Sequence, residues 1–550
     1  MKLSFYGADR CVTGSCHCLE VGGKKILIDC GLQQGRDEID NRSLPFAPNQ
    51  IDYVLVTHAH IDHTGRIPLL VKNGFCGEIL TTRLTAELMQ IMLLDSAHIQ
   101  ESEAEYDNRK GERAGKAPVE PIYTVEDAQN VFRFVSTCEY GETVALCDGV
   151  RVTFTDAGHL LGSASITLEV SENGLTRTIV FSGDIGNVDQ PIIRNPQYLK
   201  KADYVVMEST YGDRNHTEVW SYTDELAEII DETLAKGGNI VIPSFAVGRT
   251  QELLYFIREI KDAGLVKSVP DFPVYIDSPL AKQATTIFCG DLHGYLDEEA
   301  LELVKDGTHM FSFPNLHLVE TSEESKLLNM DTTPKVIISA SGMCDAGRIR
   351  HHLKHNLWRD NSAVVFVGYQ GVGTLGRRLL DGVESVRLFG EEIAVRAKIV
   401  NFQGLSSHAD HDHLLSWIES YDPRPARVFV VHGDADVIPA FSAELETRGF
   451  ATYAPLYTAS YDLAADRELE RGYQPEPKRS AVATLADDLY SKLLAAAEAL
   501  LALVRSKKGA PNKEKKAFTR QILDLIETWR KKERAANDRT CQKPGLHRHH

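Results

Sequence analysis

THAHIDHTG, residues 57–65, carries three histidines and an aspartate within six residues, and it directly follows the apolar run IDYVLV. Imidazole and carboxylate groups are the ligands that zinc and similar metals prefer in proteins. On a segment that leaves a strand, alternate residues can face one metal ion while the next pair faces another. The predicted metal ligands in this stretch are His58, His60, Asp62 and His63.

A strand followed by an acid or a histidine recurs farther along the chain. RVTFTDAG precedes His159, RTIVFSGD ends on Asp184, and ARVFVVHG contains His432. Taken singly, each residue also fits a turn former, a helix cap or a satisfied core histidine. Taken together, they supply the ligands that the 58–63 cluster lacks. Loops held by a rigid sheet are common sites of catalysis, so we expect one site at the strand ends.

The rhythm of the sequence changes twice along the chain. The N-terminal part alternates short β-branched runs with turns, which predicts strands. From about residue 209, strands alternate with amphipathic helices such as SYTDELAEIIDETLAKGG, which indicates a parallel sheet. After about residue 390 the pattern of the N-terminal part returns, so we expect one domain to be inserted into another. The expected divisions are a core of 1–208 and 391–471, an inserted α/β domain of 209–390, and a linker and helical tail of 472–550.

The tail begins with the linker-like GYQPEPKRS and continues with two segments of helical spacing, the second with basic ends. One interpretation is an appendage that forms a homodimer or docks into an RNA-processing complex. A solvated surface hairpin fits the same pattern. The basic residues suggest RNA contact, although runs of charge are usually solvated.

Composition restricts the class of protein. The chain has 550 residues, too many for one ordinary core, with 43% hydrophobic and 25% charged residues, as in soluble globular proteins. No apolar run approaches the roughly 20 residues needed to span a bilayer. The first residues, MKLSFYGADR, have no apolar stretch behind a basic start, so we expect no signal peptide. We therefore expect a cytoplasmic protein without membrane contact. The net charge of −18 argues against a broadly basic surface, but a metal centre with a few local arginines can still bind phosphates.

HxHxDH, a later GH, a later GD and a C-terminal histidine resemble the metallo-β-lactamase superfamily. The resemblance implies two zinc ions per chain, with manganese as the alternative metal. The first ion would be held by His58, His60 and His159, and the second by Asp62, His63 and His432, with Asp184 between them. Asp29 in LIDCG would orient ligand histidines. Such a pair of ions activates a hydroxide and neutralises charge on a phosphate.

The inserted domain resembles the β-CASP insertion of nucleic-acid nucleases. MESTYG with Glu208, SSHAD with His408 and VVHGD with His432 match that family's motifs A, B and C, and the resemblance covers residues 1 to about 465. It implies an αββα sandwich with an inserted α/β domain and a C-terminal helical appendage. The branch it resembles contains the endonuclease subunit of the cleavage and polyadenylation specificity factor and its bacterial and archaeal homologues.

A histidine at motif C is typical of RNA-acting members of that family. The serine before His408, where ribonuclease J usually has glycine, favours internal cutting. We therefore expect a zinc-dependent ribonuclease that acts on single-stranded RNA and cuts it internally. The alternatives are a 5′–3′ exoribonuclease, a DNA or small-molecule ester hydrolase on the same fold, and a scaffold subunit of an RNA-processing complex.

Roles beyond the metal ligands follow from the chemistry of phosphodiester cleavage. His408 is the expected general acid, because histidine titrates near neutral pH, and Glu208 would fix its tautomer. Asp62 and Asp184 complete the catalytic set. Loop residues of the insertion are expected to contact phosphates, although ordinary loop salt bridges explain the arginines nearly as well. These candidates are Arg249, Ser341, Arg348 and Arg377.

Overall fold

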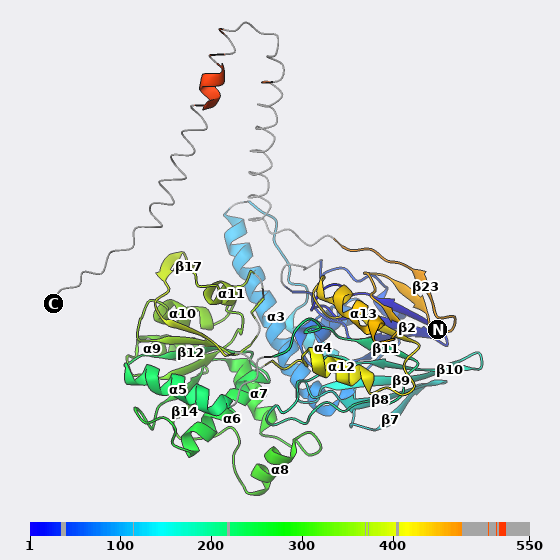
Figure 1. The fold of residues 1–550 in the computed structure, drawn as a ribbon, viewed down its shortest axis with the longest axis horizontal. Helices are drawn as coiled ribbons and strands as arrows, with labels where there is room; N and C mark the ends of the chain where they lie inside the picture. The colour runs from blue at the N-terminus through cyan, green and yellow to red at the C-terminus, as the bar shows by residue number, and fades with distance from the viewer. Residues whose placement is uncertain are drawn as a thin grey trace, which may run out of the picture. The chain divides into compact units, whose positions relative to one another are not determined.

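The computed structural model divides into two units, Met1–Pro477 and Lys478–His550 (Figure 1). It describes residues 1–34, 40–113, 115–216, 221–368, 370–371, 373–402 and 406–475, together with 504, 513, 516 and 518–523. The described residues of the second unit are helical. Most of the predicted tail, and with it the expected docking role, lies outside the described residues.

The first core sheet has eight strands in the order β23-β22-β1-β2-β3-β4-β5-β6. β22 pairs antiparallel with β1, so the end of the first unit closes on its start. The strands are β1 Lys2–Phe5, β2 His17–Val21, β3 Lys24–Ile28, β4 Tyr53–Leu55, β5 Glu78–Thr82, β6 Val135–Cys138, β22 Ser460–Asp462 and β23 Arg467–Glu470.

The second core sheet has seven strands in the order β21-β20-β11-β10-β9-β8-β7. β11 pairs parallel with β20, which joins segments that the inserted domain separates in sequence. The strands are β7 Thr143–Cys147, β8 Val150–Asp156, β9 Ala164–Glu172, β10 Leu175–Phe181, β11 Tyr204–Met207, β20 Arg427–Val430 and β21 Thr452–Tyr453.

Strands of the core are buried on both faces because helices cover the outside of each sheet. Leu55 and Leu80 pack between the two sheets, whereas their neighbours Val54 and Ile79 pack on the helix side, as the two-residue period of a strand requires. Trp417 joins the apolar layer outside the second sheet. The covering helices are α1 Ile61–Thr64, α2 Ile67–Lys72, α3 Arg83–Glu112, α4 Val125–Val131, α12 His411–Glu419 and α13 Val437–Thr447. The predicted αββα sandwich is confirmed.

The inserted domain, drawn mainly in green in Figure 1, is built on a six-stranded sheet in the order β14-β13-β15-β12-β16-β19. All its strand pairs are parallel, as the alternation of strands and helices predicted. The strands are β12 Ile240–Pro243, β13 Val274–Ile276, β14 Leu316–Leu318, β15 Val336–Ser339, β16 Ala363–Phe366 and β19 Lys398–Asn401, beside the hairpin β17 Ser385–Leu388 and β18 Glu391–Ala394. The helices are α5 Tyr222–Ala235, α6 Arg249–Asp262, α7 Pro279–Phe288, α8 Glu298–Lys305, α9 Ser322–Met330, α10 Ile349–Asn356 and α11 Leu375–Leu380.

The return from the inserted domain to the core falls late in the sequence. β19 pairs with β16, so residues 398–401 complete the sheet of the insertion. The expected division at residue 390 precedes both β18 and β19. We therefore propose that the second crossing follows Asn401, and the remaining divisions stay predictions.

Direct contacts anchor the inserted domain to the core. α3 packs on α7, and one continuous apolar cluster contains residues of both domains. The Arg83 guanidinium donates to the Asp291 carbonyl at 3.0 Å, and the Tyr295 hydroxyl donates to Glu139 at 2.9 Å. The two domains therefore form one packed unit. Within the described part of the chain, no helix has the length and apolar character to cross a membrane.

Candidate metal centre

The seven predicted metal ligands converge at strand ends of both core sheets. Five of them are buried and two, His60 and Asp62, are half-buried. They come from the β4–α1 loop and α1, from the β8–β9 loop, and from the residues that follow β10 and β20. Their side chains form two groups, His58 with His60, His159 and Asp184, and Asp62 with His63 and His432.

The first group presents three imidazole nitrogens and one carboxylate oxygen to a common point. His60 Nδ1 lies 3.0 Å from His58 Nε2 and 3.2 Å from His159 Nε2. Asp184 Oδ2 lies 3.5 Å from the Nε2 atoms of both His58 and His159. Four donors at these separations are arranged as the corners of one coordination site.

The second group uses the other oxygen of Asp184. Asp184 Oδ1 lies 3.2 Å from His63 Nε2 and 3.5 Å from His432 Nε2, and these two nitrogens are 3.2 Å apart. Asp62 Oδ2 completes the group at 3.6 Å from His432 Nε2. Asp184 is therefore placed between the two groups, with one oxygen directed to each.

The donor set fits a pair of tetrahedral metal ions. With Zn–N bonds of about 2.0–2.1 Å, neighbouring ligands of a tetrahedral ion lie about 3.3–3.4 Å apart, close to the spacings of both groups. Asp184 Oδ1 is buried and has no hydrogen-bond partner in the described part of the chain. A buried carboxylate without such a partner is costly unless a cation balances it.

Electrostatics of the site favour metal binding. Burial lowers the pKa of His58 and of His159 well below the ordinary value, so both imidazoles are neutral and keep a lone pair for a metal. Burial raises the pKa of Asp184, but His432 and His63 outweigh this effect and hold it well below its usual range. Burial lowers the pKa of His63 and of His432, but the Asp184 carboxylate outweighs burial and raises both, so a metal ion that binds these two rings would displace their protons.

Hydrogen bonds behind the ligands fix their orientation. Asp29 accepts a bond from His63 Nδ1 at 2.7 Å, and it also accepts from the backbone N–H and the hydroxyl of Thr57, each at 2.8 Å. The sequence indicated this role for Asp29 but not for Thr57. Two further groups that sequence reasoning missed are the Ser407 carbonyl, 3.1 Å from His159 Nδ1, and the Thr210 hydroxyl, 3.2 Å from His432 Nδ1. Their only sequence signal is adjacency to the motifs.

Backbone conformation at the centre is unusual for side-chain-bearing residues. Asp29 and His432 have φ values of 60° and 48°, in the left-handed region that costs free energy outside glycine. Gly158, just before His159, has φ of 64°, and a Cβ there would lie 2.5 Å from the backbone nitrogen of Pro196. A glycine is therefore required for the turn that directs His159 inward.

Glu208 and His408 form a pair beside the two groups. His408 Nδ1 donates to the Glu208 oxygens at 3.1 and 3.3 Å, while its Nε2 lies 3.9 Å from Asp184 Oδ2. The buried Glu208 carboxylate also accepts the backbone N–H of Ile185 at 2.6 Å. Burial lowers the pKa of His408, but Glu208 and Asp184 outweigh it and raise that pKa to about 9.

The predicted phosphate-binding residues of the inserted domain have partners within the protein. Arg249 is buried against the Glu252 carboxylate, and Arg377 lies exposed with its Nε 2.9 Å from Asp381. Ser341 is half-buried, and its hydroxyl donates to the Ala346 carbonyl at 3.4 Å. Their contact with substrate stays a prediction.

Arg348 belongs to a hydrogen-bond network, centred on the buried Asp277, behind the 339–348 loop. Its Nη1 donates to Asp277 Oδ1 at 2.6 Å and its Nη2 to the Glu320 carbonyl at 2.8 Å. His352 Nε2 lies 2.6 Å from the other oxygen of Asp277, whose side chain is fully buried. Burial raises the pKa of Asp277, but these hydrogen bonds outweigh burial and keep it below its ordinary value. The network therefore contains an ionised carboxylate that fixes the loop.

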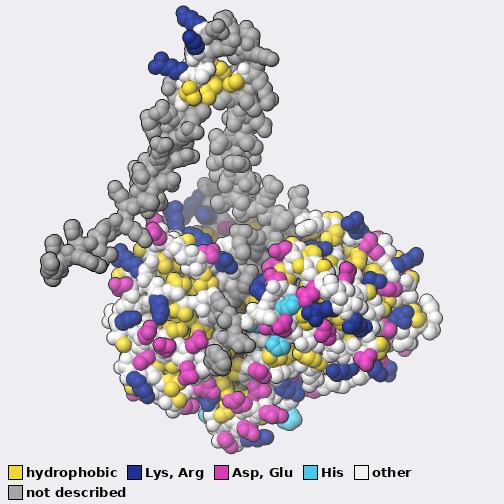
Figure 2. Space-filling model, viewed as in Figure 1, with side chains coloured by type: hydrophobic (Ala, Val, Ile, Leu, Met, Phe, Trp, Pro, Cys, Tyr) yellow, Lys and Arg dark blue, Asp and Glu magenta, His cyan; other side chains and the backbone are white. Residues whose placement is uncertain are grey.

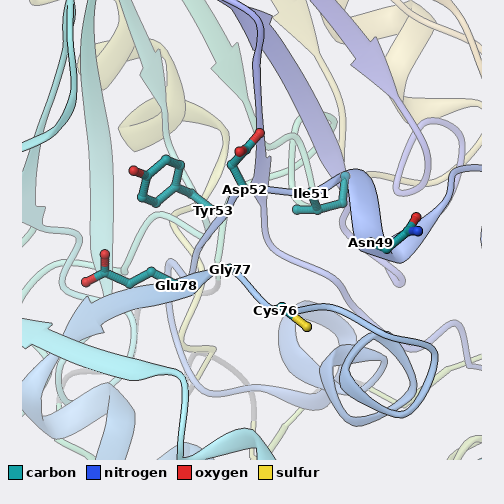
Figure 3. Close-up of a pocket in the computed structure, with 7 residues that line it drawn as sticks. All are labelled: Asn49, Ile51, Asp52, Tyr53, Cys76, Gly77 and Glu78. Carbon is teal, nitrogen blue, oxygen red and sulfur yellow. The ribbon is translucent and has the colours of Figure 1, made fainter.

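A separate hollow of about 340 Å³ lies elsewhere on the core. Figure 3 shows that its side chains point in different directions instead of converging on one point. The hollow is lined by Asn49, Ile51, Asp52, Tyr53, Cys76, Gly77 and Glu78, none of which is a predicted ligand. It does not share the chemistry of the strand-end site.

An αββα sandwich that gathers two groups of metal donors around one carboxylate defines a metal-dependent hydrolase of the metallo-β-lactamase kind. Family comparisons agree, because residues 9–196 match the metallo-β-lactamase superfamily, 250–379 the Beta-Casp domain, and 392–455 the Zn-dependent metallo-hydrolase RNA specificity domain. The chain belongs to the β-CASP family of RNA-processing nucleases within that superfamily.

Curated relatives match most of the chain. The ribonuclease TTHA0252 of Thermus thermophilus is 38% identical over 450 residues, which cover 82% of this chain and 97% of that protein. The transcription termination factor FttA of Methanosarcina mazei is 31% identical over 79% of this chain and 67% of its own length. FttA of Thermococcus kodakarensis is 31% identical over 83% and 70%, respectively.

Metal content tests the bridging position of Asp184. We expect the parent protein to bind two ions per chain, Asp184→Ala to lose both, and His432→Ala to lose one, as measured by mass spectrometry of protein-bound metal. Asp412→Ala, which removes an exposed carboxylate of α12, should keep both ions. Two ions retained by Asp184→Ala would show that the carboxylate does not bridge the groups.

The stability of Arg348 variants tests the contribution of Arg348 to the hydrogen-bond network around Asp277. Arg348→Ala leaves the Asp277 carboxylate buried with one charged partner fewer, so we expect a loss of about 3–5 kcal/mol in urea unfolding. Arg377→Ala removes an exposed ion pair and should cost less than about 1 kcal/mol. Equal stability of the two variants would mean that Arg348 does not hold the loop.

Proposed function

We propose that this chain is a ribonuclease that hydrolyses phosphodiester bonds of single-stranded RNA with two zinc ions at the strand-end site. The observation that carries the proposal is the position of Asp184 between two donor groups, with the Glu208–His408 pair alongside. A relative named as a ribonuclease, similar over nearly its whole length, supports RNA as the substrate. The complete donor set argues against a purely scaffolding role.

In this proposal the two donor groups hold the ions, and manganese is the alternative metal. When bound, such ions activate water and offset negative charge on a phosphate. The chain's own contribution is rigidity, because Asp29, Thr57, Thr210 and the Ser407 carbonyl fix the rings behind the site. Rings that cannot rotate keep their lone pairs directed at one point.

His408 is proposed as the proton donor to the leaving oxygen. Glu208 accepts a hydrogen bond from the Nδ1–H of His408, which leaves Nε2 facing the Asp184 side of the site. The Glu208 carboxylate is itself held by the Ile185 N–H, so the tautomer and the ring orientation are both fixed. The His408 side chain is 20% exposed, in contrast to the fully enclosed His58, and can therefore meet a substrate.

RNA would be contacted locally instead of through a broad basic face. Figure 2 shows Lys and Arg side chains interspersed with Asp and Glu over the face it draws. With a net charge of −18, the surface as a whole repels a polyanion, so affinity depends on the metal centre and nearby neutral or basic groups. The proposed phosphate contacts are Ser341 and Arg377, whereas Arg249 and Arg348 would act by shaping their loops.

Internal cutting is the proposed mode. Its support is the serine before His408, the pattern that resembles the cleavage-factor branch of the family. Removal of nucleotides from the 5′ end is the alternative, and the lengths of the first products distinguish the two modes.

Cleavage of a labelled single-stranded RNA and its DNA counterpart tests the proposed function. We expect the zinc-loaded parent to cut RNA into internal fragments and to leave DNA intact, and Asp184→Ala to cut neither. Products that shorten one nucleotide at a time from the 5′ end would replace the proposed mode. Hydrolysis of a small phosphodiester without cleavage of RNA would contradict the RNA assignment.

His408→Ala should slow RNA cleavage by about 10²- to 10⁴-fold, the usual contribution of a general acid, while both metal ions remain bound. Glu208→Gln should give a smaller loss, because it weakens the orientation of His408. The matched control is His411→Ala, whose ring instead pairs with Asp412 and Glu444. Cleavage at the parent rate by His408→Ala would remove it from the mechanism.

A further inference from the structure

Phe245 is an exposed aromatic residue in an otherwise buried loop. The loop PSFAVGR connects β12 to α6, and the Phe245 side chain is 45% exposed. Its neighbours Ser244, Ala246 and Val247 are all buried. Single exposed apolar residues are common, so exposure alone has no meaning. The rigidity and the position of this loop are what distinguish Phe245.

Several hydrogen bonds make the Phe245 loop rigid. The Thr250 hydroxyl donates to the Phe245 carbonyl at 2.7 Å, and the Ser244 N–H donates to the Ser339 carbonyl at 3.1 Å. Gln251 accepts the Gly248 N–H at 2.7 Å through its side-chain oxygen. The backbone of the loop is therefore held in one conformation while the ring of Phe245 stays accessible. A fixed aromatic ring loses little conformational entropy when a ligand stacks on it.

The Phe245 loop contacts Leu160 of the core on one side and the 339–348 loop on the other. On one side, a Cβ placed on Gly248 would lie 3.0 Å from Leu160 Cδ1, and Leu160 follows the metal ligand His159. On the other side, a Cβ on Gly342 would lie 3.1 Å from two atoms of the Phe245 ring. The absence of a side chain at Gly342 lets the loop and the ring pack closely. Phe245 thus lies on a loop of the inserted domain that packs against the core residue next to His159 in sequence.

We propose that Phe245 stacks on a nucleobase of the strand whose phosphate lies at the metal centre. This inference rests on the proposed function. An acidic protein gains little from a polyanion's charge at long range, whereas stacking on an aromatic ring needs no charge and accepts every base. Bases of single-stranded RNA are free to stack in this way, whereas paired bases are not. Phe245 would therefore select unpaired RNA and set the position of the strand.

The chain offers a matched control for Phe245. Phe389 lies in the same inserted domain and is 47% exposed, nearly equal to Phe245. Its ring stacks on His351 of α10, with centroids 4.2 Å apart, instead of lying in the loop that contacts Leu160. Removal of either ring therefore takes away a comparable apolar surface, and only one removal should affect RNA.

The experiment measures KM and kcat for cleavage of a labelled single-stranded RNA by zinc-loaded protein. We expect Phe245→Ala to raise KM about 10- to 100-fold, the range that stacking of one base supports, with kcat little changed. Phe245→Trp should restore the parent KM, and Phe389→Ala should match the parent. The unfolding temperature of each variant checks that the fold is intact.

A series of RNAs, each lacking the base at one position, completes the test. One abasic position should raise KM for the parent but not for Phe245→Ala, because base and ring belong to one interaction. If Phe245→Ala cuts every RNA of the series with the parent KM, the inference is wrong and the proposed function stands. If the parent cuts no RNA yet hydrolyses bis(p-nitrophenyl) phosphate, the proposed function fails, and the stacking inference fails with it.

Discussion

The buried carboxylate of Asp184, surrounded by imidazoles, is the constraint on which the rest of this structure depends. One oxygen faces His58 and His159, and the other faces His63 and His432. Such a cluster is costly to bury unless cations neutralise it, so metal ions bound between these groups would stabilise the core. Strands of both sheets must end at the correct level to supply the donors. The sandwich is therefore the scaffold that sets the spacing of the site.

In the inserted domain, too, a buried carboxylate fixes the surrounding backbone. Its 339–348 loop is fixed by the Asp277 carboxylate, which binds Arg348 and His352 in the interior. The neighbouring loop packs through Gly248 on Leu160, which follows the candidate metal ligand His159. Buried charges are retained where they hold a backbone in place, because a satisfied network permits one arrangement and penalises others. The domain thus reaches the metal centre through rigid loops.

An acidic protein that processes RNA must concentrate its attraction for the strand. Figure 2 shows charges of both signs interspersed on the visible face. Screening limits the reach of isolated charges to about 10 Å at moderate salt, so the site and its immediate surroundings decide where a strand binds. The proposed metal pair and the proposed stacking on the uncharged ring of Phe245 would both suit this situation. Neither depends on the net charge of the surface.

The sequence by itself indicated the candidate metal ligands, the sandwich and the presence of an inserted α/β domain, because these follow from short-range patterns. Three histidines and an aspartate within residues 58–63 are close in space whatever the rest of the fold, because they are close in sequence. Short apolar runs that alternate with polar residues predict strands from local sequence alone. Only the tertiary structure decided how exposed each predicted arginine is and which carboxylate it meets. Arg348 meets the buried Asp277 carboxylate, which lies 71 positions earlier in the sequence, whereas Arg249 meets Glu252 three residues along its own helix α6. The roles of Thr210, the exposure of Phe245 and the membership of β19 in the inserted sheet were equally hidden, since each depends on contacts between distant segments.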